Sequence, residues 1–315
     1  MFFSRHSKLL KKGVLGMNMR NADFILTYNK RHLYPLVDNK LNTKQLAVKA
    51  GITVPELYGV IQYQHQIRKL PKMLDCYNQF VIKPSKGSGG KGILVISGKE
   101  KGSFIKSNGT AINQDDIDRH VSNIVSGLYS LGGQIDCAMI EYHVNFSPIF
   151  KDISYQGVPD IRVIIFQGYP IMAMLRLPTS ASDGKANLHQ GAIGVGIDID
   201  NGKSSHAVCK DKPTDKHPDT NISFKGLTIP GWRNLLLLAS RCYEITGLGY
   251  IGVDIVLDDT LGPMILELNA RPGLAIQSAN NAGLFPRLQK IQKMAPKRLS
   301  VEKRVDFVQK EFSSG

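Results

Sequence analysis

Short turns, rather than helices, join the runs of β-branched and aromatic residues in the second half of this 315-residue chain. DIRVIIF (160–166) is followed almost at once by PIMAMLRL (170–177), and an Asn201–Gly202 turn separates GAIGVGIDID from KSSHAV. Strands joined by such short turns pair antiparallel, because parallel neighbours need a long crossover. The pattern therefore predicts an α+β fold with antiparallel sheets rather than a doubly wound parallel sheet.

Helical patterns lie before, between and after these strands. NKLNTKQLAVKA (39–50) has one apolar face and stops at Gly51, and GWRNLLLLASRCYEITG (231–247) carries an apolar stripe. Further helices are predicted at 62–75 and 115–131, at the C-terminus over 300–312 where the helix would pack on the large lobe, and weakly around Ser4–Leu15.

A glycine-rich segment, FVIKPSKGSGGKGILVI (80–96), joins two predicted strands. Its glycines permit positive φ and close backbone approach, and its lysines supply cations. Two interpretations use the same residues, a solvated hairpin turn or a loop that holds phosphate. The segment does not match a Walker P-loop, because Gly92 follows Lys91 where Ser or Thr is needed.

A second hairpin, GVDIVLDDTLGPMILELN (252–269), carries two carboxylates. A two-residue turn centred on Thr260 and Leu261 would place Asp254 directly across from Glu267, with Asn269 on the face of Glu267. Like charges facing each other on half-buried strands call for a cation between them, and such oxygen ligands suit Mg²⁺. The alternative is that one carboxylate lies at the solvent edge while the other pairs with Arg271.

Composition indicates a globular protein without a membrane span. The chain is 42% hydrophobic, enough for a core and two or three lobes, and it contains no run of about 18 apolar residues. The basic start lacks the apolar core and cleavage site of a signal peptide. Four scattered cysteines, without a CxxC pair, indicate neither a disulfide framework nor a zinc site, so a reducing cytoplasm is expected.

Positive charge is concentrated in the first third of the chain. Residues 1–110 contain 19 Lys or Arg and 5 Asp or Glu, which accounts for the whole net charge of +14. Such a region would attract an acidic substrate and its nucleotide, an anionic membrane surface or nucleic acid, and a solvated basic face is the alternative.

The phosphate-compatible loop and the magnesium-compatible hairpin together describe a nucleotide–metal site, and with them the chain resembles the ATP-grasp enzymes, nearest to the alpha-L-glutamate ligase (RimK-like) branch. The resemblance is carried, in order, by DNKLNTK (38–44), FVIKPSKGSGGKGI (80–93), IEYHV (140–144), DIRVIIF (160–166), NLHQGA (187–192), GVDIVLD (252–258) and ILELNARPGL (265–274). These stretches span about three quarters of the chain.

The resemblance implies an ATP-grasp fold, in which two α+β lobes with antiparallel sheets clasp ATP. Only 37 residues precede Asp38, so the αβ domain that usually comes first in the family would be truncated. The implied domains are a basic segment at 1–37, a helical part of the N-terminal lobe at 38–75, a lid subdomain at 76–145, a large subdomain with the metal site at 146–295, and a C-terminal helix at 296–315.

The resemblance also assigns nucleotide contacts. Lys40 matches the lysine that reaches the α-phosphate, and Lys83 the strand lysine at the α- and β-phosphates. The loop would close over the β- and γ-phosphates with backbone donors, whereas Lys86 and Lys91 either touch phosphate or belong to the basic face. The residues of the loop that would contact phosphate are Ser85, Gly87, Ser88, Gly89, Gly90 and Gly92. The hinge that would contact the adenine consists of Glu141, Tyr142 and Val144. For Tyr142 the alternative is an ordinary strand residue.

The remaining implied roles concern metal and catalysis. Asp254, Glu267 and Asn269 match the ligands of Mg²⁺, for which Mn²⁺ is a possible substitute. Arg162, Arg176 and Asn187 fall near the transferred phosphate and the acceptor, with a salt-bridged strand residue as the alternative for Arg162. Arg271 replaces a small residue of glutamate ligases and is interpreted as a reader of a substrate carboxylate, with pairing to Glu267 or Asp254 as the alternative.

One position departs from the family pattern. Pro148 stands where relatives often carry an acidic ribose contact, and Asp152 and Asp160 are the available substitutes.

The function implied is an ATP- and Mg²⁺-dependent carboxylate–amine ligase working through an acylphosphate. Its partners would be ATP, an acidic amino acid or other carboxylate, and an amine acceptor on a peptide, protein or small molecule. One alternative is a ligase of a sugar or cell-surface polymer pathway. The other is a non-catalytic basic protein that binds nucleic acid or a membrane surface; nucleic acid is not the expected partner, and contact of the basic N-terminus with a membrane surface stays open.

Overall fold

Two compact units make up the chain in the computed structural model, which describes residues 8–87, 89–294 and 299–312. Unit 1 comprises the described residues of Met1–Asp38, Gln45–Thr53 and Phe146–Gly315, and unit 2 comprises those of Asn39–Lys44 and Val54–Asn145. Each unit is built on its own sheet, and the strand pairs of both sheets are antiparallel. The predicted α+β class with antiparallel sheets is confirmed.

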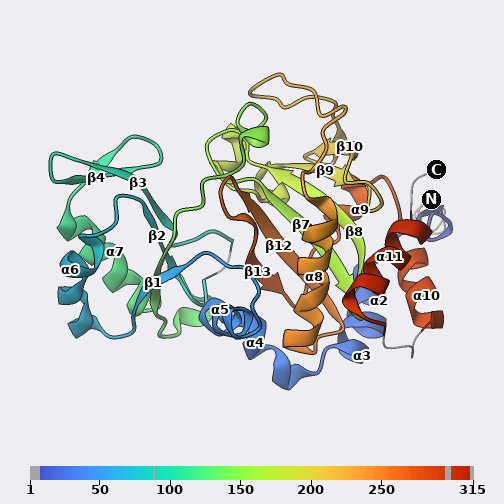
Figure 1. Ribbon diagram of the computed structural model, residues 1–315, viewed down its shortest axis with the longest axis horizontal. Coiled ribbons are helices and arrows are strands. Elements are labelled where there is room, and N and C mark those ends of the chain that lie inside the picture. Colours follow the sequence, from blue (N-terminus) through green and yellow to red (C-terminus); the bar gives the residue numbers. More distant parts are fainter. Residues whose placement is uncertain (1–7, 88, 295–298, 313–315) are drawn as a thin grey trace. The chain divides into compact units, whose positions relative to one another are not determined.

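Unit 2 is a six-stranded sheet in the order β1-β6-β2-β3-β4-β5, with helices on one face (Figure 1). Phe80, Ile82 and Ile140 pack on that face against Ile117 and Val121 of α7. Because side chains alternate along a strand, the intervening side chains point to the other face. The elements are β1 (Leu57–Ile61), α6 (Leu70–Leu74), β2 (Phe80–Pro84), β3 (Leu94–Glu100), β4 (Ser103–Lys106), β5 (Ala111–Ile112), α7 (Gln114–Val125) and β6 (Ala138–Glu141).

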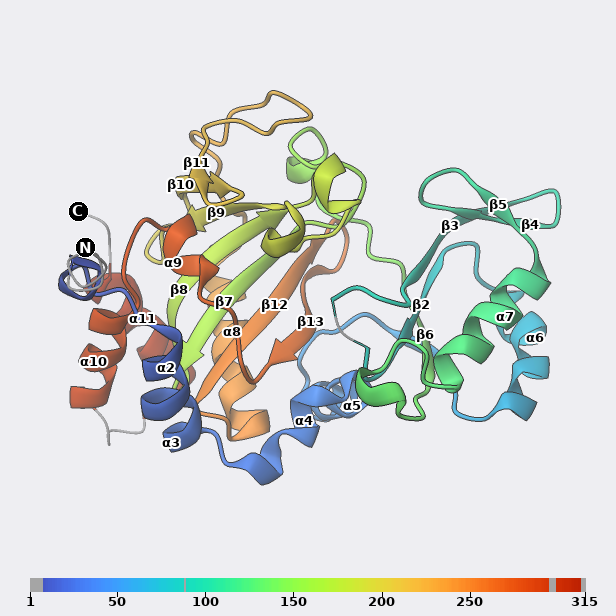
Figure 2. The same ribbon diagram turned by 180° about the vertical axis from the view of Figure 1, so that it is seen from behind.

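Unit 1 is a seven-stranded sheet in the order β11-β10-β9-β8-β7-β12-β13. One face is covered by α8 and α11 (Figure 1), and α9 lies on the opposite face (Figure 2). The elements are β7 (Asp160–Phe166), β8 (Tyr169–Leu177), β9 (Ile193–Ile197), β10 (Ser204–Cys209), β11 (Lys212–Pro213), α8 (Trp232–Thr246), β12 (Tyr250–Asp258), β13 (Gly262–Asn269), α9 (Ala275–Ala279), α10 (Phe285–Met294) and α11 (Val301–Glu311).

Within unit 1, the part of the chain before Asp38 packs on the seven-stranded sheet through aromatic side chains. Phe24 meets the ring of Phe166 edge-on at 5.6 Å between centroids, and Tyr28 meets it at 4.9 Å. Asn29 ties the segment to β12 by hydrogen bonds with both the carbonyl and the amide of Tyr250. The elements here are α2 (Met17–Met19), the π-helical η1 (Arg20–Ile25), α3 (Leu26–Tyr28), η2 (Arg31–Leu33), α4 (Pro35–Asp38) and α5 (Lys40–Lys49).

Most predicted helices form, with different ends. The helix predicted at 62–75 is a 3₁₀ segment, η3 (Gln64–Lys69), followed by α6. The helix predicted at 115–131 stops at Val125, because the chain turns at Gly127 with φ +87°, a conformation that a helix cannot contain. Of the weak pattern around Ser4–Leu15, residues 8–11 are helical and residues 4–7 lie outside the described part.

The predicted C-terminal helix is confirmed as α11, which buries Val305 and Val308 against the large sheet and α8. The described helices include none that is both long and apolar enough to span a bilayer.

Candidate functional site

A buried cluster of two aspartates and two arginines lies on β12, β7 and β8 of unit 1. Arg162 faces Asp254 in register and donates two hydrogen bonds to its carboxylate, at 2.7 Å from Nε and 2.6 Å from Nη2. Arg176 lies 2.8 Å from Asp254 Oδ2 through Nη2. Arg176 also donates two hydrogen bonds to the carboxylate of Asp160, at 2.5 and 2.7 Å. The four charges therefore balance within one network, which is how buried charges are tolerated.

The electrostatics of this network differ between its two carboxyl groups. Burial works against ionisation of Asp254, but Arg162 and Arg176 outweigh it and hold the pKa of Asp254 below its ordinary value. Burial raises the pKa of Asp160, and the neighbouring charge of Asp254 adds to that effect while Arg176 opposes it. Asp254 is thus held as the anion of the cluster.

The facing of Asp254 and Glu267 that the sequence predicts is confirmed, but through a different turn. Asp258 pairs with Gly262, so the loop has three residues instead of the two predicted. That turn alone would place Asp254 opposite Leu266. A register shift between Asp254 and Ile255 restores the pairing of Asp254 with Glu267, because one extra residue in a strand exchanges the two faces.

Asn269 joins the cluster, and Arg271 takes another position. The side-chain amide of Asn269 donates to Asp254 Oδ2 at 3.2 Å. The guanidinium of Arg271 lies over the ring of Tyr34, 5.3 Å from its centroid. The expected cation beside Asp254 is therefore supplied by Arg162 and Arg176, and the alternative that pairs Arg271 with Asp254 is wrong.

The donor set of this hairpin is compatible with a hard cation. Asp254, Glu267 and Asn269 offer oxygen ligands, and Mg²⁺ needs only one or two protein carboxylates because water and phosphate complete its shell. In the ranges described, no three His, Cys, Asp or Glu side chains come together as a metal site by themselves. A cation at Asp254 would therefore share it with, or displace, an arginine.

Asn187 has a structural part in its loop. Its side-chain oxygen accepts the amide hydrogen of His189 at 3.0 Å, which caps the short 3₁₀ segment η7 (Leu188–Gln190). Its carbonyl also accepts from Gln190 and Ala192. Asn187 thus shapes the loop that carries His189.

In unit 2, two lysines share one buried carboxylate. Lys83 on β2 and Lys44 on α5 both pair with Glu141 on β6, Lys44 at 2.9 Å. The three side chains are 3 to 7% exposed, and Lys44 also donates to the carbonyl of Pro55. Burial lowers the pKa of Lys44, with Glu141 opposing that effect. With all three groups ionised the cluster carries one excess positive charge, on the sheet face opposite the hydrophobic core.

The predicted hinge residues are fixed by other parts of unit 2. The carboxylate of Glu141 is engaged by the two lysines, so its side chain belongs to the lysine cluster. The amide of Tyr142 donates to the carbonyl of Glu56 at 2.9 Å, and Val144 is buried. The main-chain amide of Tyr142 is therefore used within unit 2.

The glycine-rich loop is anchored at its start by Asp136, which precedes β6. This carboxylate is buried and accepts hydrogen bonds from the Ser85 hydroxyl at 2.6 Å, the Ser130 hydroxyl at 2.5 Å and the amides of Lys86 and Cys137. Ser85 also donates its amide to the carbonyl of Cys137. Both donors of Ser85 are thus used within the protein, and we interpret Ser85 as a support of the loop instead of the phosphate contact implied by the resemblance.

Further along the loop, Lys40 and the glycines shape the turn. The ammonium of Lys40 donates to the carbonyl of Gly87 at 2.6 Å. Gly89, Gly90 and Gly92 have positive φ, and a Cβ at Gly92 would lie 2.6 Å from the ring of Tyr129. Only glycine fits at Gly92 without displacing that ring. Ser88 lies outside the described residues.

We expect Asp136→Asn to loosen this loop. The substitution turns one acceptor oxygen into a donor facing other donors, which should lower the free energy of unfolding by about 1.5–3 kcal/mol. Urea denaturation measures the loss, and Asp75→Asn, at an exposed position, is the matched control. Equal denaturation midpoints for Asp136→Asn and the wild type would show that Asp136 does not anchor the loop.

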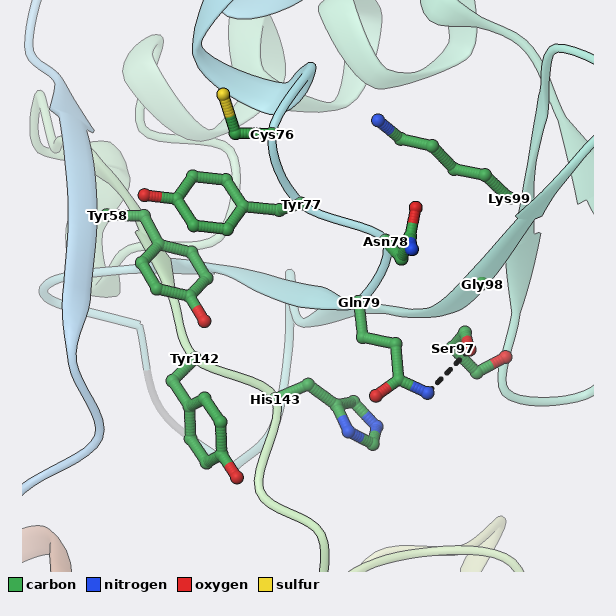
Figure 3. A pocket seen from close by; sticks show the side chains of 10 residues that line it. All are labelled: Tyr58, Cys76, Tyr77, Asn78, Gln79, Ser97, Gly98, Lys99, Tyr142 and His143. Atoms are coloured by element: carbon green, nitrogen blue, oxygen red, sulfur yellow. Dashed lines mark hydrogen bonds between the residues drawn. The ribbon is translucent and has the colours of Figure 1, made fainter.

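A pocket of about 550 Å³ opens in unit 2 beside the hinge (Figure 3). Two of its walls are Tyr58 and Tyr77, whose rings stack at 3.7 Å between centroids with an interplanar angle of 9°. Gln79 crosses to the next strand by donating to the carbonyl of Ser97 at 2.9 Å. The lining residues are Tyr58, Cys76, Tyr77, Asn78, Gln79, Ser97, Gly98, Lys99, Tyr142 and His143.

Sequence reasoning missed three residues of these sites, Lys44, Asp136 and Asp160 as a partner of Arg176. Lys44 had a usable signal, because it lies four residues after Lys40 on the predicted helix and therefore on the same face. Asp136 lies just before β6 and belongs to no motif, and Asp160 is the first residue of β7 and of the stretch DIRVIIF, which does not indicate its partner. Their roles depend on partners that only the fold brings near.

The sequence matches the family described as sugar-transfer associated ATP-grasp over residues 19–293. The chain belongs to this family. The two antiparallel α+β units accord with the ATP-grasp fold that the family implies, and the match covers both charge clusters.

Several solved ATP-grasp structures are similar to the chain at low identity. The ligase PsnB complexed with a minimal precursor is 14% identical over 86% of this chain and 63% of its own, with a TM-score of 0.46. A D-alanine–D-alanine ligase from Bacillus anthracis is 13% identical over 88% and 67%, with a TM-score of 0.44. A RiPP-associated ligase from Chryseobacterium gregarium is 12% identical over 87% and 65%, with a TM-score of 0.47.

This ATP-grasp protein thus spans less than two thirds of the PsnB chain. Among curated proteins, no sequence matches it.

Proposed function

We propose that this ATP-grasp protein is an ATP- and Mg²⁺-dependent ligase that joins a carboxylate to an amine through an acylphosphate. The observation that carries the proposal is the cluster around Asp254, where two arginines and three oxygen-bearing side chains lie on neighbouring strands of unit 1. Arginines placed by buried aspartates are preorganised to meet the negative charge of a transferring phosphoryl group.

The lysine cluster of unit 2 supports nucleotide binding. Lys44 and Lys83 share a single carboxylate, so a phosphate group beside them would neutralise the excess buried charge. We further propose that Lys40 and the glycine loop contact the phosphates, and that the base lies toward the hinge, where the pocket beside Tyr142 offers room.

The reaction would proceed in two balanced steps. An oxygen of the substrate carboxylate forms a bond to the γ-phosphorus while the bond from that phosphorus to ADP breaks. The amine nitrogen then bonds to the acyl carbon, phosphate leaves with the C–O bond electrons, and the amine loses a proton. Arg162 and Arg176 would hold the charged oxygens in place. Bound Mg²⁺, held by Asp254, Glu267 and Asn269, would supply neutralisation of phosphate charge.

Two substrate classes are proposed within this chemistry. The family description favours a ligase of a sugar-transfer or surface-polymer pathway. A RimK-like glutamate ligase is the other candidate, supported by the motif set around NLHQGA and ILELNARPGL. Arg271 is exposed and follows the β12–β13 hairpin that carries the proposed Mg²⁺ ligands. It suits a substrate that carries a second carboxylate, which both classes can provide.

The test is ADP and phosphate release with Mg-ATP across carboxylates, including amino acids and sugar acids, each with a panel of amines. We expect at least one pair to stimulate release, and Glu267→Gln to lower its rate at least about 100-fold through loss of a charged metal ligand. Asp259→Asn, exposed at the tip of the same hairpin, is the control and should act like the wild type.

The ligase proposal fails if no pair stimulates ADP release and if wild type and Glu267→Gln bind Mg-ATP equally poorly. Separate arms with sugar acids and with glutamate distinguish the two substrate classes.

A further inference from the structure

A second pocket, of about 230 Å³, lies in unit 1 outside the arginine–aspartate cluster. It has an apolar wall and a charged rim, and its size suits a ligand smaller than a drug-sized molecule. The lining residues are Leu188, His189, Ala192, Val208, Lys210, Asp211 and Ala275.

This pocket lies on the same sheet face as the cluster. Arg176 on β8 pairs in register with Gly194 on β9, which pairs with Val208 on β10. Directly paired residues of antiparallel strands project to one face, and two strand spacings amount to about 10 Å. The pocket wall at Val208 is therefore about 10 Å along the sheet from Arg176.

The missing side chain of Gly194 makes room for the pocket wall. A Cβ at Gly194 would lie 2.7 Å from Leu188 Cδ2 and 3.2 Å from the Cβ of Ala279 in α9. Leu188 and α9 therefore cover the sheet on this face, where Figure 2 shows α9. The loop capped by Asn187 is held against the strand next to Arg176, so the pocket and the cluster share one surface.

The charged rim comes from the turn between β10 and β11. Cys209 pairs with Lys212, so Lys210 and Asp211 form a two-residue turn, with φ of +49° and +61°. This is the conformation for which Asn-Gly is preferred, yet the turn carries two oppositely charged side chains at the pocket. Both are exposed residues of the rim, able to meet a charged ligand.

We propose that this pocket binds the amine acceptor, and that the acceptor is an α-amino acid or a compound with the same zwitterionic head; this inference rests on the proposed ligase function. Asp211 pairs with the ammonium group before it loses its proton, and Lys210 pairs with the α-carboxylate. The wall of Leu188, Ala192 and Val208 takes a small apolar side chain. The acceptor would then lie on the sheet face that carries the arginines.

The test measures binding without turnover. The full chain, with Mg²⁺ and a non-hydrolysable ATP analogue, is titrated with glycine, alanine, serine and glutamate, with lactate, which lacks the ammonium, and with alanine methyl ester, which lacks the carboxylate. We expect lactate and the ester to bind about 2- to 5-fold more weakly than alanine, because each lacks one ion pair to an exposed side chain, and such pairs contribute little in water.

Two variants and a control test whether Asp211 and Lys210 cause the preferences for alanine over lactate and over the ester. Asp211→Asn should remove the preference for alanine over lactate, and Lys210→Gln the preference for alanine over its ester. Asn tolerates the left-handed conformation, so the turn should persist. Lys212→Gln, one position outside the pocket lining and exposed, should leave both preferences intact.

The proposal is overturned if no amino acid of the panel binds the wild type, or if Asp211→Asn and Lys210→Gln keep both preferences. ADP release, measured separately, distinguishes the two proposals. Release with an amine that shows no such preference would retain the ligase function and reject this pocket. Binding with the expected preferences but without ADP release for any substrate pair would show an amino-acid pocket and reject both the ligase and the acceptor role of the pocket.

Discussion

Replacing Lys83 with Met is expected to weaken Mg-ATP binding by about 100- to 1,000-fold, as for loss of a buried charge contact to phosphate. The substitution shortens the side chain by one atom and removes the ammonium group, with its charge and its hydrogen-bond donors. Because Lys44 and Lys83 share Glu141, the variant leaves Lys44 and Glu141 as a one-to-one pair. Its free energy of unfolding should therefore equal or exceed that of the wild type.

Titration with Mg-ATP measures the change in affinity, and urea denaturation of the same samples measures the change in the free energy of unfolding. Lys69→Met, at an exposed position of unit 2, is the matched control and should change neither quantity. Wild-type affinity in Lys83→Met would contradict a phosphate contact. A large loss of stability would instead mean that Lys83 balances Glu141 on its own.

Replacing Asp254 with Asn should have the largest effect on stability. The carboxylate accepts two hydrogen bonds from Arg162 and lies 2.8 Å from Arg176, so its loss leaves an uncompensated buried guanidinium. Breaking such a pair costs about 3–5 kcal/mol of unfolding free energy. ADP release should be abolished as well, because Asp254 is one of the proposed Mg²⁺ ligands.

A double variant separates charge balance from packing. Arg162→Gln combined with Asp254→Asn restores neutrality, and we expect it to be less destabilised than the sum of the two single changes. Asp259→Asn should stay within about 0.5 kcal/mol of the wild type in the same urea titration. Additive single effects would show that Asp254 acts without coupling to Arg162.

Local patterns predicted much of the fold because they depend on neighbouring residues. The hairpins at 80–96 and 160–177 follow from strand runs that lie close together in the sequence, and both form. The end of the helix at Val125 escaped prediction, since the turn at Gly127 packs against the carbonyl of Gln134, a contact made by the fold.

In the candidate sites too, local contacts could be predicted from the sequence and long-range contacts could not. The facing of Asp254 and Glu267 could be predicted because side chains alternate along a strand, although the actual turn needs a bulge to achieve it. Asp136 could not be predicted, because its partner Ser85 lies 51 positions away and no motif joins them.

The amino-acid sequence by itself determined the α+β class, the antiparallel hairpins and the ATP-grasp family. Periodicity, turn residues and the order of motifs are local properties of the sequence and can be recognised without the fold. Only the tertiary structure decided which charges meet. It joined Arg162 to Asp254, Arg176 to both aspartates, and two lysines to Glu141. Those pairings depend on strand order and register between distant segments, and a buried charge takes its partner from the neighbours that the packed sheet provides.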